Sequence, residues 1–291
     1  MKKTETQINI HDFPEELHPY LAGADIFDSS SSPKAKVYFI SPRYYLKVGE
    51  RGSLMHEAFM ARWFYKNGLG VEVIWYGGSD RDYMLTNAAE GEDCTEFLDN
   101  PERLCSVMAG AMKMLHSLPA AELPACVARG DYEKALKSGS GNYDSSILMP
   151  RFMKPSIEET TLKEGTSSGE KIISNAIIAP AEKISFKEGI SSKEEAWAIM
   201  QENKHRLKCD TLIHGDFCLP NIMVKDGRFS CFIDLAMAGL GDKHIDLYWA
   251  LWSLQYNLGT EKYTDYFLDL YGRENFEYDM LRVIAAFEAF G

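Results

Sequence analysis

Two aspartates and an asparagine between them are the side chains in this sequence best suited to chemistry. Asn221 follows Asp216 by five residues, and Asp234 follows Asn221 by thirteen. Phosphoryl transfer needs such a set: one carboxylate beside the acceptor hydroxyl, and an amide oxygen and a second carboxylate on Mg²⁺. The pattern therefore predicts that Asp216 is catalytic, that His214 supports its loop, and that Asn221 and Asp234 bind the metal.

The segments around these residues predict how they are brought together. Residues 222–224 and 229–233 are apolar runs rich in strand-forming residues, and Asp226-Gly227 between them is typical of a tight turn. A hairpin of this kind would return the chain so that Asn221 lies beside Asp234. One ion could then contact both side chains.

The N-terminal part of the chain is predicted to be mostly strand, and it carries a lysine in an unusual place. Residues 37–40 and 44–48 alternate in polarity around Ser41-Pro42, which indicates a hairpin with Lys47 inside its second strand. Residues 54–65 form a predicted helix, which would begin at Ser53 as a cap and end at Asn67-Gly68. Further helices are predicted over 101–118 and from a capping box at 191–195 to about 205.

The run from His214 to Asp234, continuing without a gap to Gly259, resembles the aminoglycoside phosphotransferases. It is most similar to the branch that modifies the 3′-hydroxyl of kanamycin-type sugars, an activity that gives antibiotic resistance. Its Asp-to-Asn spacing also equals that of the protein-kinase catalytic loop. The resemblance implies an α+β, two-lobed protein-kinase-like fold with a small antiparallel β-sheet lobe and a larger, mostly helical lobe. The expected division is a nucleotide-binding lobe at 1–87, a hinge at 88–91, and a catalytic and acceptor-binding lobe at 92–291.

The same resemblance implies that the cofactors are ATP or GTP together with Mg²⁺. Lys47 would contact the nucleotide phosphates, and Glu57 would hold Lys47 in place through an ion pair. The serine-rich loop before Pro33 lies where the family covers the phosphates, although it contains no glycine. The remaining expected nucleotide contacts are Ser31 and Ser32 in that loop and Thr86, Asn87 and Ala89 at the hinge.

The acceptor site is expected to be less acidic than in relatives that bind polycations. The resemblance places typical charged positions at Trp252, Tyr256 and Asn257, and one of two neighbouring acids becomes Phe287 while Glu288 remains. On a helix, Trp249, Trp252 and Tyr256 form one aromatic stripe, which either lines the pocket or packs in the core. The divergent insert at 154–195 would form one wall of this pocket.

Three alternatives remain open from the sequence. The acceptor is another amino alcohol or antibiotic with less positive charge. The protein binds nucleotide without catalysis, because Met237 stands where the family has an arginine and the phosphate loop lacks glycine. The third alternative is a metal-dependent hydrolase that uses His214, Asp216, Asp234 and His244.

The bulk composition agrees with a cytoplasmic enzyme acting on small molecules. The chain has 291 residues, 45% hydrophobic content and a formal net charge of −12, which disfavours nucleic acid and anionic membranes as partners. Six cysteines show no metal-type spacing, and no apolar run is long enough to span a membrane. We expect a monomer or weak homodimer whose partners are the nucleotide and the acceptor.

Overall fold

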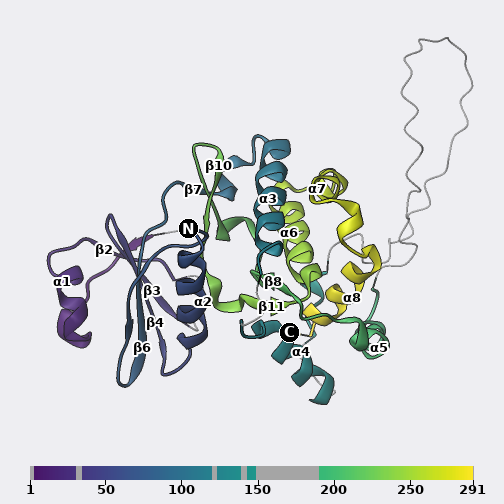
Figure 1. The fold of residues 1–291 in the computed structure, drawn as a ribbon. Coiled ribbons are helices and arrows are strands. Elements are labelled where there is room, and N and C mark those ends of the chain that lie inside the picture. The colour runs from purple at the N-terminus through teal and green to yellow at the C-terminus, as the bar shows by residue number, and fades with distance from the viewer. Residues whose placement is uncertain (1–2, 31–34, 120–122, 139–142, 149–189, 291) are drawn as a thin grey trace, which may run out of the picture.

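The structure is a computed structural model that describes residues 3–30, 35–119, 123–138, 143–148 and 190–290. Its N-terminal part is a six-stranded sheet with the strand order β1-β2-β3-β4-β6-β5, in which all neighbouring strands run antiparallel (Figure 1). The strands are β1 (Thr4–Glu5), β2 (Ile26–Asp28), β3 (Lys36–Ile40), β4 (Tyr44–Glu50), β5 (Val73–Gly77) and β6 (Arg81–Asn87). Two helices accompany this sheet, α1 (His18–Leu21) and α2 (Met55–Lys66).

The predicted hairpin at the centre of the sheet is confirmed. Val37 of β3 pairs with Lys47 of β4, and Ile40 pairs with Tyr44 at the turn. Because side chains alternate along a strand, Leu46 and Val48 enter the core on one face while Lys47 points to the other face. The alternation in the sequence thus determines which face of the sheet receives the lysine.

Helix α2 begins close to the predicted residue, but its N-terminus is not capped by the predicted serine. Ser53 does not cap it, because the Ser53 hydroxyl donates a hydrogen bond to the carbonyl of Glu50 at 2.7 Å. Leu54 occupies the cap position without any side-chain hydrogen bond. The helix ends as predicted at Asn67, followed by Gly68 with a φ of +73°, which glycine adopts without strain.

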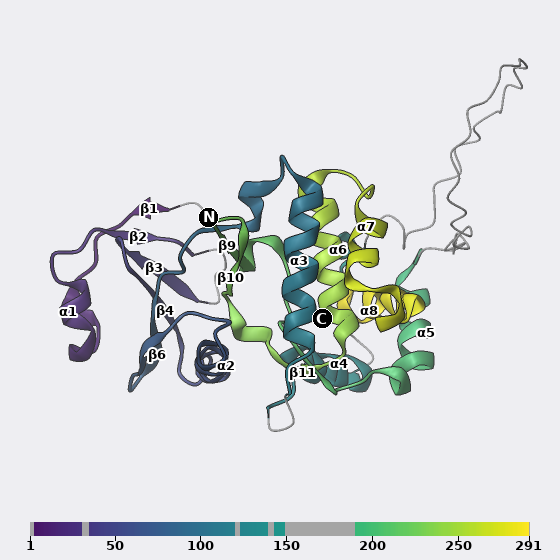
Figure 2. The ribbon, with the colours of Figure 1, turned by 45° about the horizontal axis from the view of Figure 1, so that its top comes forward.

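The C-terminal part is mostly helical and lies beside the sheet lobe (Figures 1 and 2). Its helices are α3 (Pro101–His116), α4 (Val127–Ser138), α5 (Lys193–Asn203), α6 (Lys243–Leu258), α7 (Thr264–Tyr271) and α8 (Tyr278–Glu288). A three-stranded sheet, ordered β10-β9-β7, consists of β7 (Glu92–Asp93), β9 (Ile222–Lys225) and β10 (Arg228–Phe232). A two-stranded sheet pairs β8 (Thr211–Ile213) with β11 (Gly239–Gly241). In both ribbon views β9 and β10 lie between the N-terminal sheet and α3, so they sit where the two parts meet.

The sequence predictions for this part are largely confirmed. Helix α3 has the predicted span to within two residues, and Leu104, Met108 and Leu115 on one face are fully or almost fully buried. Ser192 caps α5 by accepting a hydrogen bond from the Glu195 amide at 3.1 Å. The carboxylate of Glu195 reaches back to the amide of Ser191 rather than Ser192, so the capping box is one residue wider than expected. The insert at 154–195 lies mostly outside the described residues.

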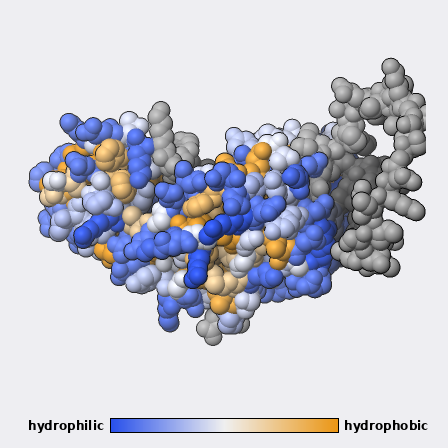
Figure 3. Space-filling model, turned by 90° about the horizontal axis from the view of Figure 1, so that it is seen from above, coloured by the Kyte–Doolittle hydropathy of each residue, from blue (hydrophilic) through white to orange (hydrophobic). Residues whose placement is uncertain are grey.

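Figure 3 shows one face of the molecule as largely hydrophilic, with hydrophobic residues gathered in separate small patches. Among the residues that the structure describes, no helix combines the length and apolar character required to cross a membrane.

Candidate active site

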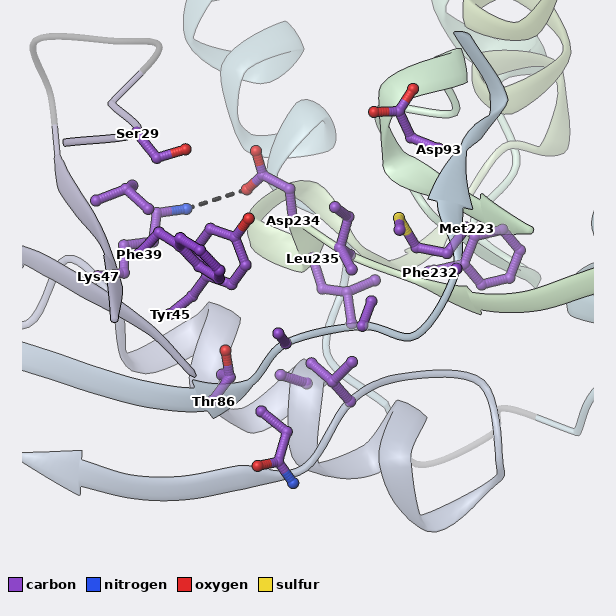
Figure 4. Close-up of a pocket in the computed structure, with 18 of the residues that line it drawn as sticks. Ser29, Phe39, Tyr45, Lys47, Thr86, Asp93, Met223, Phe232, Asp234 and Leu235 are labelled. Carbon is purple, nitrogen blue, oxygen red and sulfur yellow. Dashed lines mark hydrogen bonds and ion pairs between the residues drawn. The ribbon is translucent and has the colours of Figure 1, made fainter. Parts of the chain in front are cut away.

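A cavity of about 640 Å³ lies between the sheet lobe and the β9–β10 hairpin (Figure 4). One wall comes from β3 and β4, and the opposite wall comes from β9, β10 and the residues that follow β10. The segment between β6 and β7 closes one end. The residues that line the cavity include Ser29, Phe39, Tyr45, Lys47, Thr86, Asn87, Ala89, Met223, Phe232 and Asp234.

Lys47 links the two walls of this cavity. Its ammonium nitrogen lies 2.8 Å from a carboxylate oxygen of Glu57 on α2 and 3.0 Å from Asp234 Oδ1, the contact drawn in Figure 4. Burial alone lowers the pKa of Lys47, but the charges of Glu57 and Asp234 outweigh it and raise the pKa above its usual value. Lys47 is therefore a fixed positive charge within the cavity.

The β9–β10 hairpin places Asp234 opposite Lys47. Phe232 of β10 pairs with Ile222 of β9, and the Ile233 amide donates to the Asn221 carbonyl at 3.0 Å. Asp234 then adopts a left-handed backbone conformation with a φ of +55°, which is uncommon for a residue other than glycine. Its side chain is 45% exposed and faces the cavity. The predicted proximity of Asn221 to the end of β10 is confirmed at the level of the backbone.

The loop after β8 holds Asp216 through a neutral histidine. The Ile233 carbonyl can only accept, so His214 Nε2 donates to it at 3.0 Å, while Nδ1 accepts from the Asp216 amide at 3.3 Å. Asp216 Oδ2 in turn accepts from the Asn221 side-chain nitrogen at 2.9 Å. His214 is fully buried, so it supports the loop from behind and does not face a substrate.

A buried carboxylate that sequence reasoning did not assign anchors the same loop. Asp246 on α6 accepts hydrogen bonds from the amides of His214 at 2.9 Å and Gly215 at 2.8 Å. It also lies 3.1 Å from His116 Nε2, and His116 Nδ1 lies 2.9 Å from the Tyr271 hydroxyl. The sequence signal for this role was a charged residue near the start of a mostly apolar helix. The partners of Asp246 could not be identified from that signal, because they are distant in the sequence.

The residues present fit a Mg²⁺ site completed by phosphate oxygens. The side-chain nitrogen of Asn221 is used by Asp216, which leaves the amide oxygen for a cation, and Asp234 contributes an exposed carboxylate. No cluster of three or more His, Cys, Asp or Glu suited to a metal occurs in the described part of the chain. Mg²⁺ commonly takes one or two carboxylates and completes its shell with phosphate and water.

The metal set of the alternative hydrolase is not assembled. His244 is buried, with Nδ1 2.5 Å from Asp242 and Nε2 accepting from the Glu277 amide at 2.9 Å. His214 likewise has both ring nitrogens in hydrogen bonds within the fold. Neither imidazole presents a nitrogen to a metal, so this alternative is wrong for the geometry observed.

The other expected nucleotide residues are placed as follows. Thr86, Asn87 and Ala89 all line the cavity, whereas Ser31 and Ser32 lie outside the described residues. Ser29, two residues earlier, lines the cavity and is buried, and its hydroxyl is a buried polar group for which the described structure shows no hydrogen-bond partner. Such a group is suited to a ligand oxygen.

Two aromatic residues of the cavity were missed by sequence reasoning. Phe39 and Tyr45 pair across β3 and β4, with ring centroids 4.9 Å apart, and both line the cavity. Tyr45 lies two positions before Lys47, so the alternation that places the lysine in the cavity places this ring there as well. Their flat faces are suited to a planar base.

The expected acceptor residues divide into two groups. Trp252 and Tyr256 stack with centroids 5.0 Å apart and an interplanar angle of 7°, and Tyr256 is 73% exposed. Asn257 donates back to the Ser253 carbonyl within α6. Phe287 is fully buried against Tyr132, with ring centroids 4.8 Å apart, so the expectation that it faces the acceptor is wrong. An apolar side chain on the inner face of α8 packs into the core.

Glu288, in contrast, lies near the catalytic loop. The hydroxyl of Tyr132 on α4 donates a hydrogen bond to its carboxylate. Burial raises the pKa of Glu288 to about 7, the hydrogen bond from Tyr132 opposes that rise, and the charge of Asp216 adds to it. Glu288 and Asp216 thus form an acidic region at the inner end of the aromatic stripe.

Comparison with known proteins agrees with this geometry. A family model described as "Phosphotransferase enzyme family" matches residues 31–284. A probable aminoglycoside 3′-phosphotransferase of Lactococcus lactis is 35% identical over 292 residues, covering 99% of this chain and 98% of the relative. An aminoglycoside 3′-phosphotransferase of Niallia circulans is 29% identical over 217 residues, covering 74% and 69%.

Solved structures show the same fold at lower identity. An aminoglycoside 3′-phosphotransferase of type VIII aligns with a TM-score of 0.65 and 19% identity, covering 97% of this chain and 99% of that one. A Streptomyces rimosus aminoglycoside phosphotransferase in complex with ADP and streptomycin aligns with a TM-score of 0.65 and 17% identity, covering 98% and 99%. The two-lobed, protein-kinase-like α+β fold is therefore confirmed. From the match along most of its length, the chain belongs to the phosphotransferase enzyme family.

Proposed function

We propose that this protein is a kinase that transfers the γ-phosphoryl group of ATP or GTP to a hydroxyl of an aminoglycoside-like acceptor, with antibiotic resistance as the consequence. The observation that carries this proposal is the double contact of Lys47 with Glu57 and Asp234 inside a cavity of nucleotide size. The names of two relatives support the acceptor class, one matching 99% of this chain and the other 74%.

Residues 1–87 would serve as the nucleotide-binding lobe, 88–91 as the hinge, and 92–291 as the catalytic and acceptor-binding lobe. The base would lie between Tyr45 and Met223, both of which line the cavity. Its edge would meet the backbone of 87–89, where the Asn87 and Ala88 amides already donate to Glu72 and Arg43. The Ala89 amide shows no backbone partner in the described structure, so it is the donor best placed for a base nitrogen.

The phosphates would lie near Lys47 and the hydroxyl of Ser29. Asn221 and Asp234 would hold Mg²⁺, which supplies positive charge to neutralise the phosphate oxygens. Glu57 keeps Lys47 aimed at the same region. The bound ADP in the Streptomyces rimosus enzyme supports a nucleotide in this fold.

Asp216 would engage the acceptor hydroxyl. As that oxygen forms a bond to the γ-phosphorus, the bond from phosphorus to the bridging oxygen breaks and ADP leaves. The hydroxyl proton passes to the Asp216 carboxylate, which Asn221 orients through its side-chain nitrogen. His214 and Asp246 hold the loop backbone, so the carboxylate is positioned before the acceptor arrives.

A second acceptor class is favoured by one observation. The Trp252–Tyr256 stack offers aromatic faces where a polycation would need carboxylates. A less cationic amino alcohol or antibiotic fits such a surface.

The test is a transfer screen with γ-³²P-labelled ATP and Mg²⁺ across kanamycin, streptomycin and simple amino alcohols. We expect label on an acceptor hydroxyl and one ADP released per phosphate transferred. A parallel screen with labelled GTP identifies the preferred nucleotide. Label on no acceptor, with nucleotide bound normally, would show a catalytically silent member of the family and contradict the proposal.

A further inference from the structure

The residue before β1 brings a positive charge to the cavity that the proposed function does not use. Lys3 lines the cavity, and its ammonium nitrogen lies 3.5 Å from the ring centroid of Phe39 and 5.6 Å from that of Tyr45. Both distances are within the range of a cation–π contact. Because β1 lies at the edge of the large sheet beside β2 (Figure 2), Lys3 reaches the cavity from outside the hairpin that carries Lys47.

The register of the sheet places Lys3 in the same row as Lys47. The pairing of β1 with β2 brings Lys3 opposite Ser29, whose amide donates to the Val37 carbonyl at 2.8 Å. Val37 in turn pairs with Lys47. Residues that lie opposite one another on neighbouring strands project their side chains from the same face of the sheet. Lys3, Ser29 and Lys47 therefore form one cross-strand row, and all three line the cavity.

Ser29 indicates that this row binds a ligand. The residue is only 3% exposed, and its hydroxyl shows no hydrogen-bond partner in the described structure. In Figure 4 the Ser29 hydroxyl and the Lys47 ammonium group both point toward Asp234. A buried hydroxyl of this kind favours a ligand oxygen. The row thus offers a hydroxyl together with two ammonium groups, which suits the charged oxygens of a phosphate chain.

The charges that line the cavity leave Lys3 as a cation without a partner. Among the described lining residues, two ammonium groups accompany five carboxylates, those of Glu57, Glu92, Asp93, Glu96 and Asp234. Lys47 is already paired with Glu57 and Asp234. Lys3 shows no ion pair with any residue that the structure describes. An anionic ligand would meet an excess of negative charge in the cavity, and Lys3 is placed to offset part of it.

We propose that Lys3 is a nucleotide-binding residue, whose ammonium group moves from the Phe39 ring to the phosphates of a bound nucleoside triphosphate. The inference rests on the proposed function, since it takes this cavity as the nucleotide site. A lysine side chain has a flexible stem that allows such a movement. Its contact with Phe39 holds the charge over the cavity before the nucleotide arrives, which reduces the entropy lost on binding. Strand β1 thereby becomes part of the nucleotide site.

The experiment is titration calorimetry on the full chain without an N-terminal tag, with Mg²⁺ present and no acceptor. The ligands are a non-hydrolysable ATP analogue, ADP and adenosine, and the variant is Lys3→Met, which keeps an unbranched stem but removes the charge. Because Lys3 is exposed, we expect the Kd of the ATP analogue to rise about fivefold at low salt. The Kd of ADP should rise as well, whereas that of adenosine, which has no phosphate, should change less than about twofold. High salt should reduce the difference for the ATP analogue, because it screens exposed charges.

Lys66→Met is the matched control. Lys66 is the last residue of α2 in the same lobe, is exposed, and does not line the cavity. The variant removes the same charge from the molecule, so its Kd for the ATP analogue should stay within about twofold of the parent value. Lys3→Arg keeps the positive charge and should retain most of the affinity.

Three results would overturn the role of Lys3 and leave the proposed function standing. The first is a Lys3→Met variant that binds the ATP analogue as tightly as Lys66→Met does. The second is an equal loss of affinity for adenosine, since Lys3 would then act on the base. The third is equal weakening in Lys3→Arg and Lys3→Met, which would assign the loss to a disturbed β1. A parent that binds none of the three ligands would instead remove the proposed function, and this inference with it.

Discussion

Lys47 connects the two lobes through its contact with Asp234. It contacts Glu57 from α2 and Asp234 from the end of β10, and Glu57 is only 6% exposed. Burial raises the pKa of Glu57, although the Lys47 ammonium opposes that rise. Because each charge is desolvated by the fold, removal of either one leaves the other poorly compensated.

At this scale we predict that Lys47 and Glu57 act as a unit. Lys47→Met and Glu57→Gln should each lower kcat/KM by about 100-fold, because both disturb a preorganised charge. The double variant should lose less than the product of the single losses, with a coupling of about 1–3 kcal/mol. The measurement is a double-mutant cycle on transfer to a fixed acceptor.

The exposed pair Arg273 and Asp269 on the second lobe is the control for this cycle. Its variants should change kcat/KM less than about twofold. Strict additivity for Lys47 and Glu57 would mean that their contact has no role in transfer.

At the residue level, the hairpin of β9 and β10 was predicted to return the chain to Asn221, and the Ile233 amide donates to the Asn221 carbonyl. The contact between Lys47 and Glu57 was expected only from the family resemblance, and the structure contains it. The prediction that Phe287 faces the acceptor was wrong because it relied on an alignment with an acid. The apolar phenylalanine side chain packs into the core instead. Tyr132 was missed because its partner Glu288 is 156 residues away.

At the scale of elements, the loop after β8 depends on one glycine. Gly215 has a φ of +82°, and a Cβ there would lie 2.3 Å from the Met237 carbonyl oxygen. Gly215→Ala thus combines backbone strain with a clash against main chain. We predict a loss of at least about 2 kcal/mol in the free energy of unfolding, together with a large fall in kcat.

Chemical denaturation monitored by tryptophan fluorescence measures the change in the free energy of unfolding. Gly110→Ala is the matched control, because Gly110 is exposed in α3 and a Cβ there meets nothing within 4 Å. It should stabilise the protein by about 0.5–1 kcal/mol. A Gly215→Ala variant as stable and active as the parent would show that the loop tolerates another conformation.

Local periodicity predicted the elements that form from contiguous residues. The two hairpins, α3 and α5 all carry their own turn or cap signals. The pairing of β7 with β9 and of β8 with β11 was not predicted, because these strands have only two to four residues and pair across long sequence separations. Their register is set by the packing of the whole lobe.

At the scale of the molecule, the net charge of −12 contrasts with the uncharged residues Trp252, Tyr256 and Asn257 at positions where the resemblance places charged ones. We predict that kanamycin binds the parent weakly and that its affinity falls only modestly with salt, since few ion pairs are available to screen. Tyr256→Glu should tighten binding by about 0.2–1 kcal/mol, because it adds a charged partner beside Trp252 at a position that is 73% exposed. Titration calorimetry at low and high salt measures both effects.

Tyr256→Gln is the control, because it introduces a polar side chain that carries no charge. It should leave kanamycin affinity close to that of the parent. Tight and strongly salt-dependent binding of kanamycin by the parent would contradict this prediction. Carboxylates other than Glu288 would then bind the kanamycin amines.

The separate roles of Asp216 and Asp234 provide the most direct test of phosphoryl transfer at this site. Calorimetric titration with a non-hydrolysable ATP analogue, with and without Mg²⁺, is compared with transfer for Asp216→Ala and Asp234→Ala. We predict that Asp216→Ala abolishes transfer while Mg²⁺-dependent nucleotide binding stays nearly intact, and that Asp234→Ala loses both. Equal loss of nucleotide affinity in the two variants, or transfer retained by Asp216→Ala, would contradict the assignment.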